Sequence, residues 1–136
     1  MSQHPGIVLD SSAFLAYLLS EPGAELVKQS LLGSAAMSAV NFAETLSKLS
    51  DLGQDVDEAV RRLAQRGLTG AALLIFPLDE RQALEIARLR RETRALGLSL
   101  GDRACLALGR VLGLPVETAD RLWQSMELGI EVRAIR

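Results

Sequence analysis

Four acidic residues stand at points of the sequence where an expected strand or loop passes into an expected helix. They are Asp10, Glu44, Asp102 and Asp120. In an open α/β sheet, ligands bind beyond the carboxyl ends of the strands. Carboxylates gathered there, without Cys or His beside them, are typical of a site for a hard cation such as Mg²⁺ or Mn²⁺. This chemistry predicts metal-assisted hydrolysis of a phosphodiester.

The elements that must position these acids alternate between short apolar runs and amphipathic segments. The expected strands cover residues 7–9, 35–38, 73–76, 115–118 and 131–135. The expected helices cover about 12–19, 24–32, 41–52, 55–66, 79–96 and 101–113. Strands separated by helices indicate βαβ units and a mainly parallel sheet. We therefore expect a single α/β domain over residues 1–136, with a central five-stranded sheet flanked by helices.

Each acid also has a structural explanation as part of a helix cap. The first and last of them stand where Asp is favoured as an N-cap. Glu44 follows Asn41 by three residues and Asp102 follows Ser99 by three, which is the spacing of a capping box. The joint pattern nevertheless favours a metal site. Four carboxylates at one sheet edge would raise one another's pKa and oppose folding unless a cation joined them.

Residues 55–66 show the clearest helical pattern in the chain. Asp55 and Glu58 have the spacing of a capping box, and Gly67 is well placed to end the helix. Five apolar residues recur at helical spacing and predict one buried face: Val56, Ala59, Val60, Leu63 and Ala64.

The composition describes an aliphatic core in a weakly acidic chain. Hydrophobic residues make up 49% of the sequence but aromatic residues only 4%, and the formal net charge is −2. That charge argues against coating nucleic acid by bulk attraction. The lone cysteine, Cys105, excludes an internal disulfide. The apolar run at residues 71–76 is too short to span a membrane, and residues 1–5 lack a secretory pattern. A cytoplasmic protein is expected.

At this point four segments match a known family. Val8–Ser12 is similar to its first-strand motif, and Ala43–Glu44 to its second acidic position. Leu98–Ala107 is close to the third motif, and Pro115–Trp123 resembles the fourth. Over nearly its whole length the chain resembles a PIN-domain ribonuclease, specifically a VapC-type toxin of a type II toxin–antitoxin system.

The resemblance implies a metal-dependent endoribonuclease that cleaves RNA and leaves 5′-phosphate and 3′-hydroxyl ends. Asp10, Asp102 and Asp120 would hold Mg²⁺ or Mn²⁺. Glu44 would bind metal through water or orient the attacking water. The resemblance further implies inhibition by a cognate antitoxin, and commonly a homodimer.

Several neighbours of the acids have two open readings. Ser11 and Thr118 could support the acidic residues beside them, or bond locally to backbone amides. Arg103 and Arg121 directly follow two of the acids, and we expect them to contact substrate or balance charge. Glu117 is expected to add a charge near the site.

Other expectations concern residues outside the acidic set. Cys105 and Trp123 are expected to pack in the core. The arginines at 61–66 and 88–94 are expected mainly on solvated helix faces, paired with glutamates.

Three alternatives remain open at the level of sequence. A housekeeping PIN-type nuclease would carry the same acids. A phosphatase with an aspartyl nucleophile usually has a second Asp where this chain has Ser12. A non-catalytic receiver-like binding module needs a lysine late in the chain, whereas Lys28 and Lys48 are the only lysines.

Overall fold

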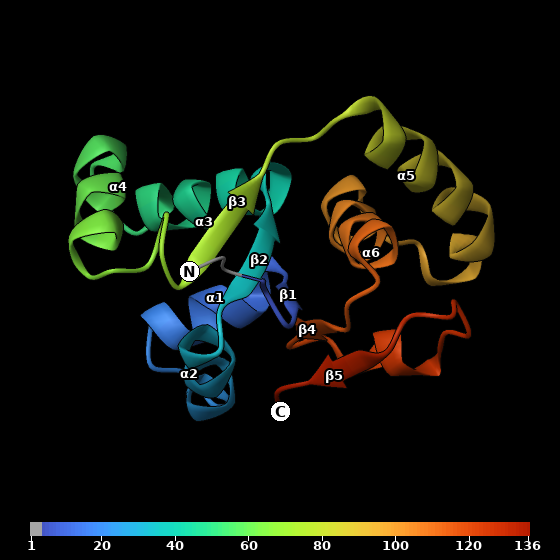
Figure 1. The fold of residues 1–136 in the computed structure, drawn as a ribbon, viewed down its shortest axis with the longest axis horizontal. Coiled ribbons are helices and arrows are strands. Elements are labelled where there is room, and N and C mark those ends of the chain that lie inside the picture. The colour runs from blue at the N-terminus through green and yellow to red at the C-terminus, as the bar shows by residue number, and fades with distance from the viewer. Residues whose placement is uncertain (1–3) are drawn as a thin grey trace.

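One five-stranded sheet, with strand order β3-β2-β1-β4-β5, organises the protein (Figure 1). The computed structural model describes residues 4–136, so the expectation about a targeting signal at residues 1–5 lies largely outside the described part. Neighbouring strands are all parallel, which confirms the expected sheet. The strands are β1 (Val8–Leu9), β2 (Ala35–Ser38), β3 (Leu73–Phe76), β4 (Val116–Thr118) and β5 (Val132–Ala134).

Helices cover both faces of this sheet. In Figure 1, α1 to α4 lie on the left and α5 and α6 on the right. The helices are α1 (Ser11–Leu18), α2 (Ala24–Leu32), α3 (Ala39–Asp51), α4 (Val56–Gln65), α5 (Glu80–Glu92) and α6 (Leu100–Leu112). Two short 3₁₀ turns follow α5 and β4: η1 (Arg94–Leu96) and η2 (Arg121–Ser125). None of the helices described combines the length and the apolar character needed to span a membrane.

The core has two layers, because successive side chains of a strand point to opposite faces. Leu9 of β1 packs into a cluster with Phe14 of α1 and Val27 of α2. Val8 packs on the other face with residues of α5 and α6, together with Trp123. Both Cys105 and Trp123 are fully buried there, as the sequence predicted. The central strand is therefore covered on both faces, and its carboxyl end has a rigid base.

The start of α3 differs from the expectation. The helix begins at Ala39, and its N-cap is Ser38, whose side chain accepts a hydrogen bond from Val40 N. Asn41 is therefore inside the helix, and its capping box with Glu44 was wrong. The physical reason is that Ser38 ends β2 with extended backbone, so the strand passes directly into the helix.

Two other helices differ from the expectation: α5 is shorter, and α4 buries a smaller face. α5 ends at Glu92, where Thr93 Oγ1 donates to Leu89 O, and only the η1 turn continues toward Gly97. In α4, Asp55 accepts from Glu58 N as expected. Only two of its five predicted face residues are buried, however, because the helix touches the rest of the protein along one edge. The buried pair is Ala59 and Leu63, whereas Val56, Val60 and Ala64 are exposed.

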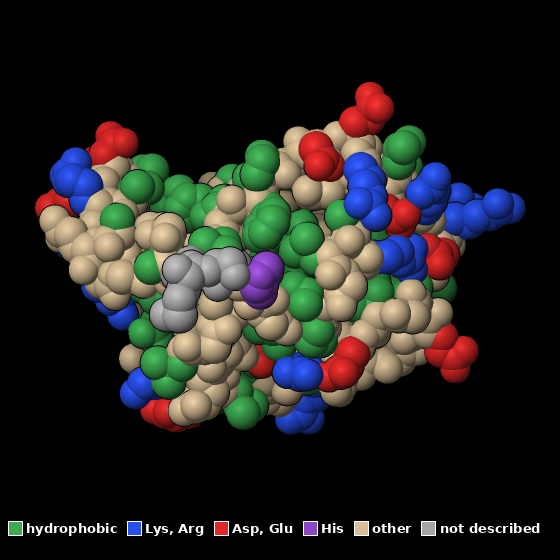
Figure 2. Space-filling view, in the orientation of Figure 1, with side chains coloured by type: hydrophobic (Ala, Val, Ile, Leu, Met, Phe, Trp, Pro, Cys, Tyr) green, Lys and Arg blue, Asp and Glu red, His purple; other side chains and the backbone are tan. Residues whose placement is uncertain are grey.

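Apolar and charged side chains separate on the face seen in Figure 2. Hydrophobic side chains gather near the purple histidine, and acidic and basic side chains gather over α5 on the right. A hollow of about 390 Å³ near His4 is lined by apolar residues that include Leu74, Phe76 and Leu112. It contains none of the four acids singled out above.

Candidate active site

Asp10 leaves the central strand β1 and caps α1. Its Oδ1 accepts hydrogen bonds from Ala13 N at 2.8 Å and from Ser12 Oγ at 2.7 Å. Its Oδ2 accepts from Thr118 Oγ1 of β4 at 2.6 Å. The side chain is 5% exposed. Every one of these partners is a donor, so the carboxylate is oriented by two neighbouring strands and one helix.

The buried position makes the charge of Asp10 costly. Burial raises the pKa of Asp10 to about 6, and the charge of Asp102 adds to the rise. Hydrogen bonds from Thr118, Ala13 and Ser12 act in the opposite direction and only partly offset it. A cation beside Asp10 would favour its ionised form. A bound cation would therefore lower the cost of the negative charge at this position.

Glu44 reaches the same region from α3. Its Oε1 accepts from Asn41 Nδ2 at 2.8 Å and from Ser11 Oγ at 3.2 Å. Its carboxylate lies directly against Gly101, since a Cβ at that position would be 2.6 Å from Oε1. Glu44 therefore sits between the residue that follows Asp10 and the residue that precedes Asp102.

Asp102 is placed by the first turn of α6. It forms the predicted capping box with Ser99: Asp102 Oδ2 accepts from Ser99 N at 3.0 Å, and Asp102 N donates to Ser99 Oγ at 3.1 Å. The three-residue spacing between Ser99 and Asp102 therefore forms the capping box that the sequence predicted. The cap does not isolate the residue electrostatically, because its charge contributes to the raised pKa of Asp10.

Asp120 follows β4 and caps η2, with Oδ1 accepting from Leu122 N at 3.0 Å. Its side chain is exposed. Its backbone N donates to Thr118 Oγ1 at 3.1 Å, and that hydroxyl donates to Asp10. One threonine hydroxyl thus connects the ends of β1 and β4.

Three of the four acids act on a common neighbour, and Asp120 does not. Burial raises the pKa of the Cys105 thiol well above its usual value, and the charges of Asp10, Asp102 and Glu44 raise it further. These three carboxylates therefore all act on the same thiol of α6. Asp120 is linked to them through Thr118 alone among the contacts described above.

Residues 4–136 contain no group of three or more His, Cys, Asp or Glu side chains already arranged as a metal cage. The donor set nevertheless fits a hard divalent ion, because all the donors are carboxylate oxygens. The capping bonds of Asp102 and Asp120 each use one carboxylate oxygen, and Glu44 is exposed. The chain thus has one oriented carboxylate at the centre and more accessible ones around it.

Three hydroxyl side chains next to the acids donate hydrogen bonds to Asp10 or Glu44. Ser11 and Thr118 contact Glu44 and Asp10, which fits the supporting reading. Sequence reasoning missed Ser12, which donates to Asp10 and accepts from Ala119 N at 2.9 Å. The sequence signal for this role was a hydroxyl residue two positions after Asp10.

Among the other charged neighbours, the structure contradicts the expected substrate contact for Arg103. Arg103 is 9% exposed and donates to Ile86 O at 3.1 Å, so it faces α5 rather than a substrate. Arg121 is exposed and donates to Arg136 O at 2.5 Å, and its expected role in substrate contact or charge balance stays a prediction. Glu117 is buried and accepts from Ser30 Oγ at 2.9 Å, because β4 points it into the layer of α2. Burial raises the pKa of Glu117 and the charge of Asp10 raises it further, so the expectation of an added charge near the site is confirmed.

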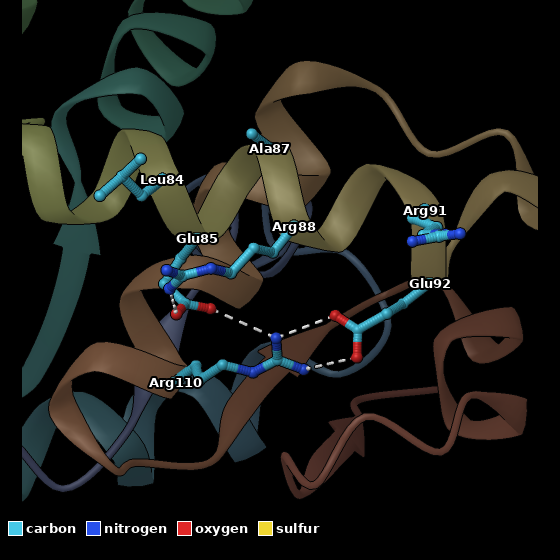
Figure 3. Close-up of a pocket in the computed structure, with 7 residues that line it drawn as sticks. All are labelled: Leu84, Glu85, Ala87, Arg88, Arg91, Glu92 and Arg110. Carbon is cyan, nitrogen blue, oxygen red and sulfur yellow. Dashed lines mark hydrogen bonds and ion pairs between the residues drawn. The ribbon is translucent and has the colours of Figure 1, made fainter.

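A large surface groove lies between α5 and α6, away from the acids. Its volume is about 680 Å³, and Figure 3 shows Arg110 reaching across it. Arg110 Nη1 lies 3.3 Å from Glu85 Oε2 and 3.0 Å from Glu92 Oε2. Arg88 also pairs with Glu85, as expected for a solvated helix face. These ion pairs join the two helices, and the groove shares no residue with the acidic site.

The fold and the acids define a single-domain α/β protein whose carboxylates gather at the end of the central strand. The sequence profile of the PIN domain matches residues 7–127, and the chain belongs to that family. The predicted resemblance is confirmed, and the protein is a nuclease of the PIN class. A comparison with curated proteins finds no sequence match.

Solved structures of toxin–antitoxin systems share the fold. A toxin–antitoxin complex from Klebsiella pneumoniae has 19% identity and a TM-score of 0.72, covering 96% of this chain and 98% of that one. VapBC2 from Rickettsia felis, bound to a promoter DNA fragment, has 13% identity and a TM-score of 0.73, covering 94% and 97%. VapBC-5 from Mycobacterium tuberculosis has 25% identity and a TM-score of 0.56, covering 98% and 99%.

Proposed function

We propose that this protein is a metal-dependent endoribonuclease that acts as the toxin of a toxin–antitoxin pair. The observation that carries the proposal is the buried Asp10 carboxylate, held at the end of the central strand of a PIN domain with Glu44 and Asp102 beside it. Metal-dependent RNA cleavage is the general activity of this family. The structural neighbours named above include a toxin–antitoxin complex and members of VapBC toxin–antitoxin systems, which supports the biological role.

In this proposal Asp10, Asp102 and Asp120 hold Mg²⁺ or Mn²⁺. The bound ion supplies Lewis-acid chemistry, favouring a hydroxide nucleophile and neutralising charge on the phosphate. Magnesium keeps several of its waters and takes only one or two carboxylates per ion. The spread of the acids is compatible with that requirement, since Asp120 is exposed and only its Oδ1 is used in the cap of η2.

The side chains of this chain supply orientation and a proton acceptor. Thr118 and Ser12 keep both oxygens of Asp10 directed by donating to them, so that residue stays an acceptor. Glu44 has its Oε1 bound by Asn41 and Ser11, which leaves Oε2 to orient or deprotonate the attacking water. In-line attack on the phosphodiester then leaves a 5′-phosphate and a 3′-hydroxyl.

A nuclease toxin must be restrained by a partner in its own cell. We propose a cognate antitoxin that covers the acidic site and places an arginine against its carboxylates, where bidentate pairing competes with metal. A homodimer and a cytoplasmic location belong to the same proposal, by family resemblance.

Controlled expression tests this role. The wild-type protein should arrest growth of its host, and Asp10→Asn should not, although Asn is an equally good N-cap. Co-expression with the product of the adjacent gene should restore growth and yield a stable complex that binds less Mn²⁺ than the free protein. If expression is harmless while the purified protein still cleaves RNA, the protein is a housekeeping PIN-type nuclease and the toxin role is wrong.

A further inference from the structure

Asn41 occupies an unusual position for a polar side chain. It lies in the first turn of α3 and is 1% exposed. Its Nδ2 donates to Glu44 Oε1 at 2.8 Å and to Gly101 O at 2.9 Å. One buried amide therefore joins an acid of the site to the first turn of α6, one residue before Asp102.

The orientation of this amide is determined by its neighbours. Both partners of Nδ2 are pure acceptors, so the NH₂ group must face them. The Asn41 Oδ1 atom is buried and has no hydrogen-bond partner among the described residues. A buried acceptor left without a donor costs about 1–3 kcal/mol. An apolar side chain of the same size would avoid that cost, so stability alone does not explain an Asn at this position.

Gly101 provides the opposite wall of the same contact. A Cβ at this position would lie 2.6 Å from both Oε1 and Cδ of Glu44, which no side chain tolerates without movement. The missing side chain lets the carboxylate rest on the first turn of α6. Gly101 is also a weak helix former in a helical position, which again opposes stability.

We propose that Asn41 is a positioning residue that, with Gly101, fixes the Glu44 carboxylate beside Asp102. The amide binds Glu44 and the Gly101 carbonyl together, so it sets the position of the Glu44 carboxylate relative to the first turn of α6. Without it, the exposed Glu44 side chain would keep, among residues 4–136, only the 3.2 Å side-chain bond from Ser11. This inference rests on the proposed function in that it treats Glu44 as an acid of the active site.

The test compares Asn41→Leu with Thr45→Val. Thr45 is a matched control, because it is equally buried one turn along α3, and its hydroxyl bonds only to the Asn41 backbone O. In the metal-free protein, NMR relaxation should show a more mobile Glu44 side chain in Asn41→Leu but not in Thr45→Val. Calorimetric titration with Mn²⁺ alone should show affinity weakened by roughly tenfold in Asn41→Leu and unchanged in the control.

Gly101→Ala tests the same contact from the other side. Alanine has a better helix propensity than glycine, so the free energy of unfolding of this variant should not fall. Its Mn²⁺ affinity should nevertheless weaken as in Asn41→Leu, because the added Cβ displaces the Glu44 carboxylate. In a Glu44→Gln background, Asn41→Leu should cause no further loss of Mn²⁺ affinity.

Two results would overturn the inference: an unchanged Glu44 mobility in Asn41→Leu, or an equal loss of Mn²⁺ affinity with and without Glu44. Failure of the proposed function looks different. It would appear as a wild-type protein that does not cleave RNA or does not bind Mn²⁺, while the mobility measurement still decides the role of Asn41.

Discussion

Asp10 concentrates the conflict between folding and chemistry in one residue. Its hydrogen bond from Ala13 N caps α1, whereas its burial and the charge of Asp102 make its ionised form costly. The structure therefore joins the capping and metal-binding explanations rather than choosing between them. What separates the two is the charge, because Asn preserves the cap and removes the negative charge.

Asp10→Asn should stabilise the metal-free protein in a pH-dependent way. The folded pKa of Asp10 is raised from 3.8 to about 6, so this residue favours folding below pH 3.8 and loses that contribution as the pH rises through 6. The advantage of Asn should grow to about 3 kcal/mol at pH 8 and shrink toward pH 4. Urea unfolding in chelator at both pH values measures it. A difference that does not change with pH would contradict the electrostatic account.

The acids could be predicted from the sequence because each stands at a recognisable strand or helix boundary. Ser12 and Asn41 could not, because their roles come from contacts with residues far along the chain. Asn41 even has the local spacing of a cap to Glu44, and only the position of Ser38 shows that the helix begins earlier. Arg103 was misread for a similar reason, since burial against α5 is a tertiary property.

At the level of elements, local patterns located every strand and α-helix. They did not predict how much of each helix surface would be buried. Short apolar runs predicted β3 and β2 to the residue, because strands buried in a parallel sheet are nearly continuously apolar. The α4 face was overestimated, because periodicity does not reveal how much of a helix meets the core. The end of α5 depends on Thr93, whose hydroxyl bonds back to the helix.

The first turn of α6 offers a way to separate a cap from a ligand. Ser99→Ala removes the cap and should lower the free energy of unfolding by about 1 kcal/mol, while Mn²⁺ affinity stays close to the wild-type value. Asp102→Asn keeps an acceptor for Ser99 N and should change stability little, yet lose Mn²⁺ affinity. Denaturant unfolding and Mn²⁺ titration of both variants decide the point. Equal Mn²⁺ affinities would reduce Asp102 to a cap.

Arg110 should stabilise the packing of α5 on α6. Its partly buried guanidinium pairs with Glu85 and Glu92 and donates to Leu128 O at 2.8 Å (Figure 3). Arg110→Met should cost about 1 kcal/mol in urea unfolding, because the partly buried Glu85 and Leu128 O lose a charged donor, whereas Glu92 is exposed to solvent. Arg88→Met is the control and should cost about 0.5 kcal/mol or less, since its ion pair is exposed. Equal losses would show that the pairing does not depend on burial.

At the scale of the whole molecule, the strand order assembles the site. Placing β1 in the centre, between β2 and β4, brings Asp10 beside the start of α3 and the turn after β4. Alternating strands and helices predicted a parallel sheet, but the order of its strands depends on which pairs pack best and is not visible in local patterns. The sequence likewise did not predict that Asp120 would be linked to the other acids through Thr118.

Metal binding should stabilise the whole domain by mass action. At a free Mn²⁺ concentration of 100 times the Kd, the folded state gains about 2.7 kcal/mol. The melting temperature should therefore rise with Mn²⁺ and return to its starting value in excess chelator. Asp10→Asn should show a much smaller rise. A rise of the same size in that variant would mean that the ion binds elsewhere.

The most direct test of the central claim is cleavage of a defined RNA by the purified protein, with sequencing of the new ends. With Mg²⁺ or Mn²⁺ we expect internal cuts that carry a 5′-phosphate and a 3′-hydroxyl. Excess chelator should abolish them, as should Asp10→Asn or Asp102→Asn in a protein that remains folded. Undiminished cleavage in excess chelator, or in Asp10→Asn, would contradict a nuclease that works through metal held by these carboxylates.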